Sequence, residues 1–238
     1  MADNENPIPR RDFLVGAGTA VAATLTPSQA EAQRAAAATP TAAGPGSAEG
    51  NLTLTAVEQA FIVAAIDTLI PADELSPSAS DCGVAVFIDR QLAGAWGAGA
   101  KLYRNGPFHK GKPEQGYQLA LTPREFFATG IAATNEWSRK KFGKDYDQLA
   151  PKEREAALKE LESGKAELND FDGKHFFEAL LTITMEGFFA DPIYGGNRNK
   201  VGWKMVGYPG LPAVYSNLID EYRNKRYSVE PQSIADFS

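Results

Sequence analysis

Residues that commonly do chemistry in proteins are few in this chain. It has two histidines, His109 and His175, and neither has another histidine or a cysteine at metal-site spacing. The sequence also lacks Gly-x-Gly-x-x-Gly, Gly-Lys-Ser/Thr, Gly-x-Ser-x-Gly and Cys-x-x-Cys-His, the motifs of dinucleotide, phosphate, nucleophile and covalent haem sites. We therefore predict no catalytic, cofactor-binding or metal-binding residues in this chain. The remaining enzymatic alternative is an unrecognised site that uses Asp191 and His175.

The densest feature is the segment 185–210, "MEGFFADPIYGGNRNKVGWKMVGYPG", which holds six glycines and two prolines among aromatic residues. Glycine permits close approach of the backbone, and aromatic residues and Met are enriched where proteins contact each other. Arg198 lies between Asn197 and Asn199, where a loop could present its guanidinium to a carboxylate or phosphate. Composition favours two interpretations equally: a contact surface, or an aromatic loop that closes over the core.

The first 32 residues resemble an export signal. An uncharged run, 13–25, would reach about 20 Å as a helix, which is too short for a bilayer core of about 30 Å. A pair of arginines precedes this run and a small-x-small cleavage site follows it, in the order of a twin-arginine signal peptide. The alternative is a chance arginine pair before a cytoplasmic helix. The signal residues are Arg10, Arg11, Phe13 and Leu14, and cleavage is expected after Ala32 or, as the second choice, Ala30.

The predicted destination is the periplasm, an oxidising compartment in which a cysteine can form a disulfide. The chain has a single cysteine, Cys82. It has no partner for a disulfide within the chain. It is either buried, which is the more common outcome, or it forms a disulfide with another subunit.

A formal net charge of −6 argues against a nucleic-acid partner. No later segment approaches the roughly 18 apolar residues of a membrane span.

The rest of the sequence predicts a mostly α protein with one helical domain and long irregular loops rich in Gly and aromatic residues. Residues 33–51 are an Ala/Thr/Pro/Gly-rich flexible linker, 52–221 the helical domain and 222–238 a C-terminal tail. Helix starts such as Thr55 to Glu58 and Thr122 to Glu125 are capping boxes. Helices are expected over 55–70, 82–92, 122–142, 151–163 and 173–190, and a long loop over 101–119.

The string from Gly187 to Arg198, followed by Gly202-Trp203-Lys204 and Gly207-Tyr208-Pro209-Gly210, resembles the gluconate 2-dehydrogenase subunit 3 family. The resemblance implies a small, mainly helical and non-catalytic subunit. Its partners would be an FAD-containing catalytic dehydrogenase subunit and a multihaem cytochrome c subunit. FAD and haem c would be bound by those partners and not by this chain.

The resemblance further implies an accessory, chaperone-like function. The chain would bind the flavin subunit in the cytoplasm, carry it through the twin-arginine translocase and stabilise it in the periplasm, associated with the inner membrane through its partners. The loop 101–119 and the segment 191–210 would form the interface. The interface residues implied are Asp191, Pro192, Tyr194, Gly195, Gly196, Asn197, Arg198, Trp203, Tyr208 and Pro209. The alternative is a free-standing periplasmic module that binds a small ligand or associates with the envelope.

Overall fold

The computed structural model describes residues 51–109, 111–112, 118–212 and 214–237. The predicted signal peptide, with Arg10, Arg11, Phe13, Leu14, Ala30 and Ala32, lies outside these residues, as does all but the last residue of the predicted linker. Within the described residues the regular structure is helical, and the one β-bridge joins Gly210 to Gln232 without forming a strand. The prediction of a mostly α fold is confirmed.

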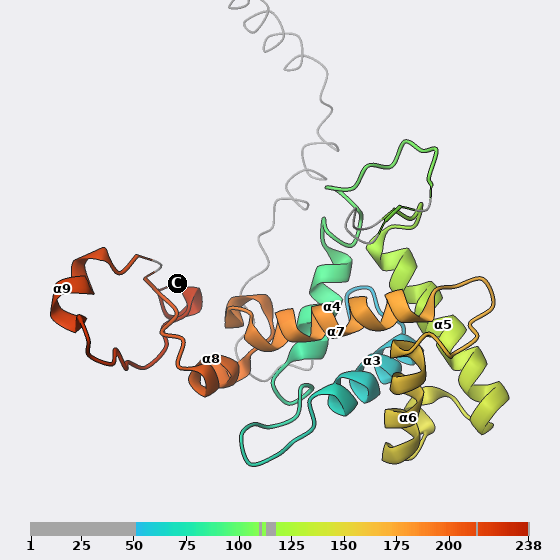
Figure 1. Cartoon of the computed structure of the whole chain (residues 1–238), viewed down its shortest axis with the longest axis horizontal. Coiled ribbons are helices and arrows are strands. Elements are labelled where there is room, and N and C mark those ends of the chain that lie inside the picture. Colours follow the sequence, from blue (N-terminus) through green and yellow to red (C-terminus); the bar gives the residue numbers. More distant parts are fainter. Residues whose placement is uncertain (1–50, 110, 113–117, 213, 238) are drawn as a thin grey trace, which may run out of the picture. The chain divides into compact units, whose positions relative to one another are not determined.

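Five longer helices form the body of the domain (Figure 1). They are α3 (Ala56–Leu69), α4 (Val84–Ala93), α5 (Pro123–Phe142), α6 (Pro151–Glu162) and α7 (Gly173–Phe189). Shorter helical turns follow: η2 (Tyr146–Gln148), η3 (Pro192–Tyr194), η4 (Arg198–Lys200), α8 (Val201–Val206), η5 (Ser216–Leu218), α9 (Ile219–Tyr222) and η6 (Ile234–Phe237).

Local capping sets the ends of α5, which match the predicted bounds. The Thr122 side chain accepts a hydrogen bond from the Glu125 backbone, and the Glu125 carboxylate accepts one from the Thr122 backbone at 2.7 Å. Pro123 occupies the first helical position, where its missing N–H is not needed. Gly143 ends the helix at φ 78°, a left-handed conformation that glycine adopts without strain.

Helix α7 holds the domain together, because it packs on α3, α4, α5 and α6 (Figure 1). Its Phe176 is fully buried and contacts the rings of Phe61 and Phe127. Gly130 on α5 allows this packing, since a Cβ there would lie 2.4 Å from the Phe176 ring. The buried residues of α3 begin at Phe61, and Val57, one turn earlier in the helix, is 58% exposed.

A buried carboxylate fastens the first described residues to α4. Asp89 is 5% exposed, and its side chain accepts hydrogen bonds from the backbone N–H groups of three consecutive residues. The distances are 2.6 Å from Leu52, 3.0 Å from Thr53 and 2.9 Å from Leu54. The helical domain therefore begins at a fixed position on α4, immediately after the predicted linker.

Candidate partner-binding surface

The segment 191–210 is organised around one buried side chain, Asn197. It is fully buried and has a left-handed backbone conformation at φ 47°. Its Nδ2 donates to the carbonyl of Ala190 at 2.9 Å, and its Oδ1 accepts from the N–H of Gly202 at 2.8 Å. Asn197 therefore connects the end of α7 to the start of α8 across the irregular segment between them.

Close backbone contacts complete this frame. A Cβ on Gly196 would lie 2.1 Å from the carbonyl oxygen of Gly187, so only glycine fits there without a shift of the backbone. Trp203 is 6% exposed, and its Nε1 donates to the carbonyl of Phe189 at 2.8 Å. Three residues implied for the interface, Gly196, Asn197 and Trp203, thus make their contacts within the chain itself.

Other apolar side chains of the same segment face solvent. Tyr194 is 51% exposed, Met205 44% and Tyr208 46%. Two further apolar residues that the sequence analysis did not single out, Ile193 and Val206, are also exposed. We call these five residues the exposed set. The segment therefore combines an internally bonded backbone with apolar side chains that are available for contact with another protein.

Arg198 connects this segment to the loop before α4. Its backbone N–H donates to the carbonyl of Cys82 at 2.9 Å, and its Nη1 donates to the carbonyl of Asp81 at 3.3 Å. The side chain is exposed, so the guanidinium remains accessible to an acidic group on a partner.

Cys82 is a free thiol with only 1% of its surface exposed. Burial, with a smaller contribution from the Asp81 carboxylate, raises the pKa of this thiol above its usual value. A raised pKa leaves less of the reactive thiolate at neutral pH. A disulfide with another subunit would require the sulfur to become exposed, and it stays a prediction.

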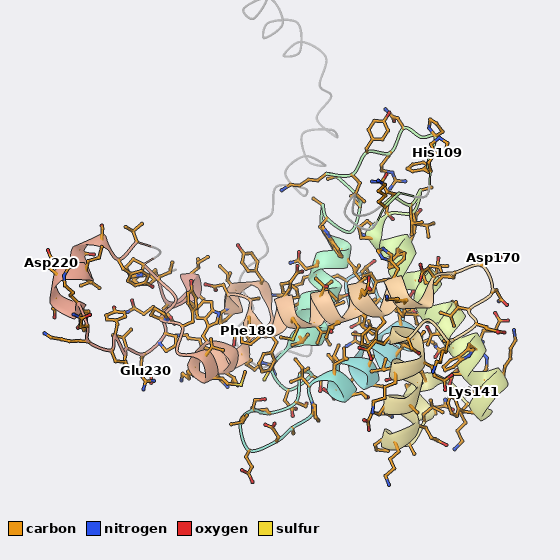
Figure 2. The ribbon with its side chains drawn as sticks, viewed as in Figure 1. His109, Lys141, Asp170, Phe189, Asp220 and Glu230 are labelled. Atoms are coloured by element: carbon orange, nitrogen blue, oxygen red, sulfur yellow. The ribbon has the colours of Figure 1, made fainter. Side chains whose placement is uncertain are left out.

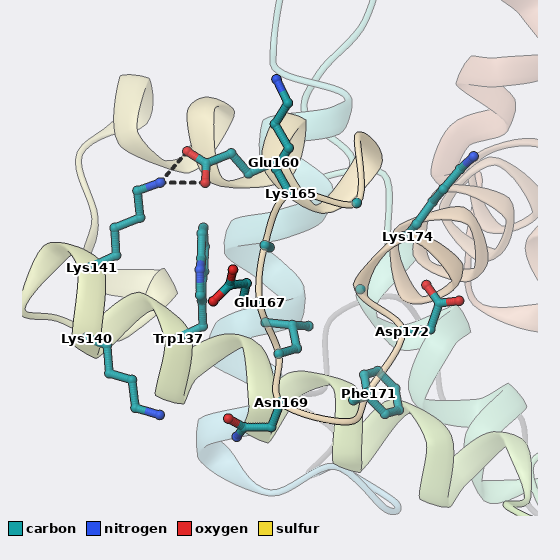
Figure 3. Close-up of a pocket in the computed structure, with 14 residues that line it drawn as sticks. Trp137, Lys140, Lys141, Glu160, Lys165, Glu167, Asn169, Phe171, Asp172 and Lys174 are labelled. Atoms are coloured by element: carbon teal, nitrogen blue, oxygen red, sulfur yellow. Dashed lines mark hydrogen bonds and ion pairs between the residues drawn. The ribbon is translucent and has the colours of Figure 1, made fainter.

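A separate hollow of about 750 Å³ lies between α5, α6 and the loop that leads into α7 (Figure 3). Its lining includes Trp137, four lysines (Lys140, Lys141, Lys165 and Lys174) and three acidic residues (Glu160, Glu167 and Asp172). Lys141 forms an ion pair with Glu160 and lies 5.3 Å from the centre of the Trp137 ring. Small-molecule sites are usually lined by apolar residues with a few polar groups. Half of the residues that line this hollow are charged, and Lys141 and Glu160 pair with each other, so its lining differs from that of a usual small-molecule site.

The family model described as Gluconate 2-dehydrogenase subunit 3 matches residues 56–210 of the chain. The chain belongs to this family. The match starts at the first residue of α3 and ends at Gly210, so it contains the five long helices and the whole segment 191–210. No curated protein and no solved structure matches the chain.

Membership in the gluconate 2-dehydrogenase subunit 3 family makes the chain a subunit of a dehydrogenase complex, an oxidoreductase. Such a complex is consistent with association with the cell envelope. In the described part of this subunit, no helix is long and apolar enough to cross a membrane. No three His, Cys, Asp or Glu side chains among the same residues are grouped to hold a metal ion.

The structure contradicts an active site formed by Asp191 and His175. His175 lies in the first turn of α7, where its ring contacts Phe126 at 5.2 Å between centres. Asp191 follows the other end of this helix and caps η3. At about 1.5 Å per residue, α7 separates the two side chains by roughly 25 Å, too far for joint action on one substrate. His109 lies on the loop between α4 and α5 (Figure 2).

Proposed function

We propose that this chain is the non-catalytic small subunit of a periplasmic FAD-dependent dehydrogenase of the gluconate 2-dehydrogenase type. It binds the flavin subunit in the cytoplasm, provides the twin-arginine signal for export of both subunits, and afterwards stabilises the flavin subunit in the periplasm. A multihaem cytochrome c subunit completes the proposed complex. FAD and haem c belong to the partner subunits.

One observation carries this proposal. The segment 191–210 lies within the family match, and its backbone is fixed from inside by Asn197 and Trp203 while the exposed set faces solvent. A preorganised backbone lowers the entropy that must be lost on association, and exposed aromatic and Met side chains supply contact area. This arrangement supports a protein interface better than it supports a catalytic site.

Co-purification tests the proposed function. We expect the tagged chain, expressed together with a flavin dehydrogenase subunit encoded next to it and lacking its own signal peptide, to purify as a complex that shows the flavin absorption spectrum. If the tagged chain elutes alone and monodisperse, the subunit function is wrong. The alternative of a free-standing ligand-binding module would then be favoured, and the hollow between α5 and α6 would be the place to examine.

The export function has its own prediction. Replacement of both Arg10 and Arg11 by Lys keeps the charge but removes the guanidinium groups that define the signal. We expect the dehydrogenase activity of fractionated cells to remain in the cytoplasm while the two subunits still co-purify. Periplasmic activity equal to that of the unchanged chain would contradict shared export without affecting the proposed complex.

A further inference from the structure

Residues 211–212 and 214–231 belong to a closed loop that extends from the segment 191–210, and we call these described residues the arm. The Leu211 N–H donates to the carbonyl of Gln232 at 2.8 Å, and the Gln232 N–H donates to the carbonyl of Pro209 at 3.0 Å. Gly210 is required at this base, because a Cβ there would lie 2.0 Å from the Gln232 carbonyl oxygen. The two ends of the arm are therefore held together at one defined point.

The chain beyond the arm returns to the segment 191–210 and fixes the base a second time. The Ile234 N–H donates to the Asp191 carboxylate at 2.9 Å. Lys200 donates to the carbonyl of Pro231 at 2.9 Å and forms an ion pair with Asp236 at 2.6 Å. The base of the arm and the segment 191–210 consequently form one hydrogen-bonded unit.

The arm is packed by its own side chains. The ring of Tyr227 lies between those of Tyr222 and Tyr215, with ring centres 4.8 Å and 5.9 Å apart. The Tyr215 hydroxyl donates to the Gly210 carbonyl at 2.8 Å, which connects this tyrosine cluster to the base. Figure 2 shows Asp220 and Glu230 on the arm, on the opposite side of the view from Lys141 of α5.

The described residues of the arm contribute no hydrophobic side chain to the core cluster. Ordering each residue of a loop costs about 1–2 kcal/mol of conformational entropy, which burial in a core normally offsets. Loops of this length in compact domains are usually either functional or linker segments, and the hydrogen bonds that close the arm at its base favour the first. The arm also exposes side chains suited to protein contact: Val214 is 66% exposed, Ile219 56%, and Arg226 is exposed nearby. Arg223 instead forms an ion pair with Asp220 of the arm at 2.9 Å.

The family match ends where the arm begins. The match stops at Gly210, the residue at which the base of the arm closes, so the arm lies outside the part of the chain that the family model describes. An element outside the family description can differ among members of the family, and such an element beside a contact surface is suited to distinguish one partner from its relatives.

We infer that the arm is a specificity element that contacts the dehydrogenase subunit of this chain's own complex. This inference rests on the proposed function. A dehydrogenase subunit seated on the segment 191–210 lies next to the base of the arm, because hydrogen bonds join the two. The surface that receives the arm has an apolar recess for Val214 and Ile219 and an acidic group opposite Arg226.

The test measures the affinity of the purified full chain for its purified flavin dehydrogenase subunit. Val214→Asp with Ile219→Asp places two charges on the arm. Val57→Asp with Leu75→Asp is the matched control, since these side chains are 58% and 74% exposed and lie outside the arm. We expect the arm variant to bind roughly tenfold to a hundredfold more weakly, and the control to bind as the unchanged chain does. Melting temperatures should remain close together, because all four side chains are exposed.

A second arm variant, Arg226→Glu, is measured in parallel, so that the inference does not depend on the folding of the first. The inference is overturned if the unchanged chain binds the dehydrogenase subunit and both arm variants bind equally well; the proposed function then stands. If the unchanged chain does not bind it at all, both are overturned. Flotation with vesicles of phosphatidylethanolamine and phosphatidylglycerol tests whether the arm binds a membrane surface. Vesicle binding that the arm variants lose, with unchanged affinity for the dehydrogenase subunit, also overturns the inference.

Discussion

Asn197→Ala should lower the free energy of unfolding by about 4 kcal/mol, close to a thousandfold in the folding equilibrium. The substitution leaves the Ala190 carbonyl and the Gly202 N–H without their hydrogen-bond partner. Each unsatisfied buried group costs about 1–3 kcal/mol. Alanine at φ 47° adds roughly 1 kcal/mol, because residues with a Cβ are strained in the left-handed region. Urea denaturation followed by circular dichroism measures the change.

Two further variants separate these contributions. Asn197→Gly removes the same hydrogen bonds but tolerates the left-handed backbone, so we expect it to be about 1 kcal/mol less destabilising than Asn197→Ala. Asn199→Ala is the matched control, because Asn199 has a similar φ of 59° and is exposed. It should cost only about 1 kcal/mol. Equal losses for Asn197→Ala and Asn199→Ala would mean that the buried hydrogen bonds of Asn197 contribute little.

Asn197→Ala is also expected to affect binding, although Asn197 itself is buried. The resemblance implies that Asn197 contacts a partner, whereas in the structure it is buried and its side chain bonds to Ala190 and Gly202. Its substitution is therefore expected to weaken the complex by loosening the backbone that presents Tyr194 and Met205. Tyr194→Ala, at a side chain 51% exposed, should weaken binding with little change in stability.

The helices could be predicted closely because their signals are local. Thr122, Pro123 and Glu125 act within one helical turn, and Gly143 needs only its own left-handed backbone to end α5. The mostly apolar pattern of α7 likewise predicts a buried helix without knowledge of its neighbours. Capping and periodicity in the sequence therefore fix the element bounds to within a few residues.

Features that depend on contacts between distant residues could not be predicted. Nothing near Gly210 in the sequence indicates that Gln232 closes the arm against it, and nothing near Asp191 indicates that Ile234 donates to its carboxylate. The separation of His175 from Asp191 becomes clear only once both are placed at opposite ends of α7. For Gly210 and Asp191, the contact depends on a backbone group from a distant segment of the chain. For His175 and Asp191, the separation depends on the length of α7.

Asp89 belongs to the same class, because the residues that it binds lie 35 to 37 positions earlier in the chain. By its spacing it is one polar residue within an amphipathic helix, yet it is 5% exposed. Asp89→Ala should lower the free energy of unfolding by about 3 kcal/mol, since three backbone N–H groups lose a charged acceptor and water can replace it only in part. Hydrogen exchange at Leu52, Thr53 and Leu54 should become faster than in the rest of the domain, because these residues detach first.

Asp89→Asn makes the prediction specific to the carboxylate. Its remaining oxygen can still accept from Thr53 and Leu54, but the amide NH₂ would face the Leu52 N–H, so we expect an intermediate loss of about 1–2 kcal/mol. Glu155→Ala is the control for loss of a carboxylate at the surface. Its ion pair with Lys159 is exposed to solvent and should contribute little to stability. If Asp89→Ala is no more destabilising than Glu155→Ala, Asp89 does not hold the start of the domain on α4.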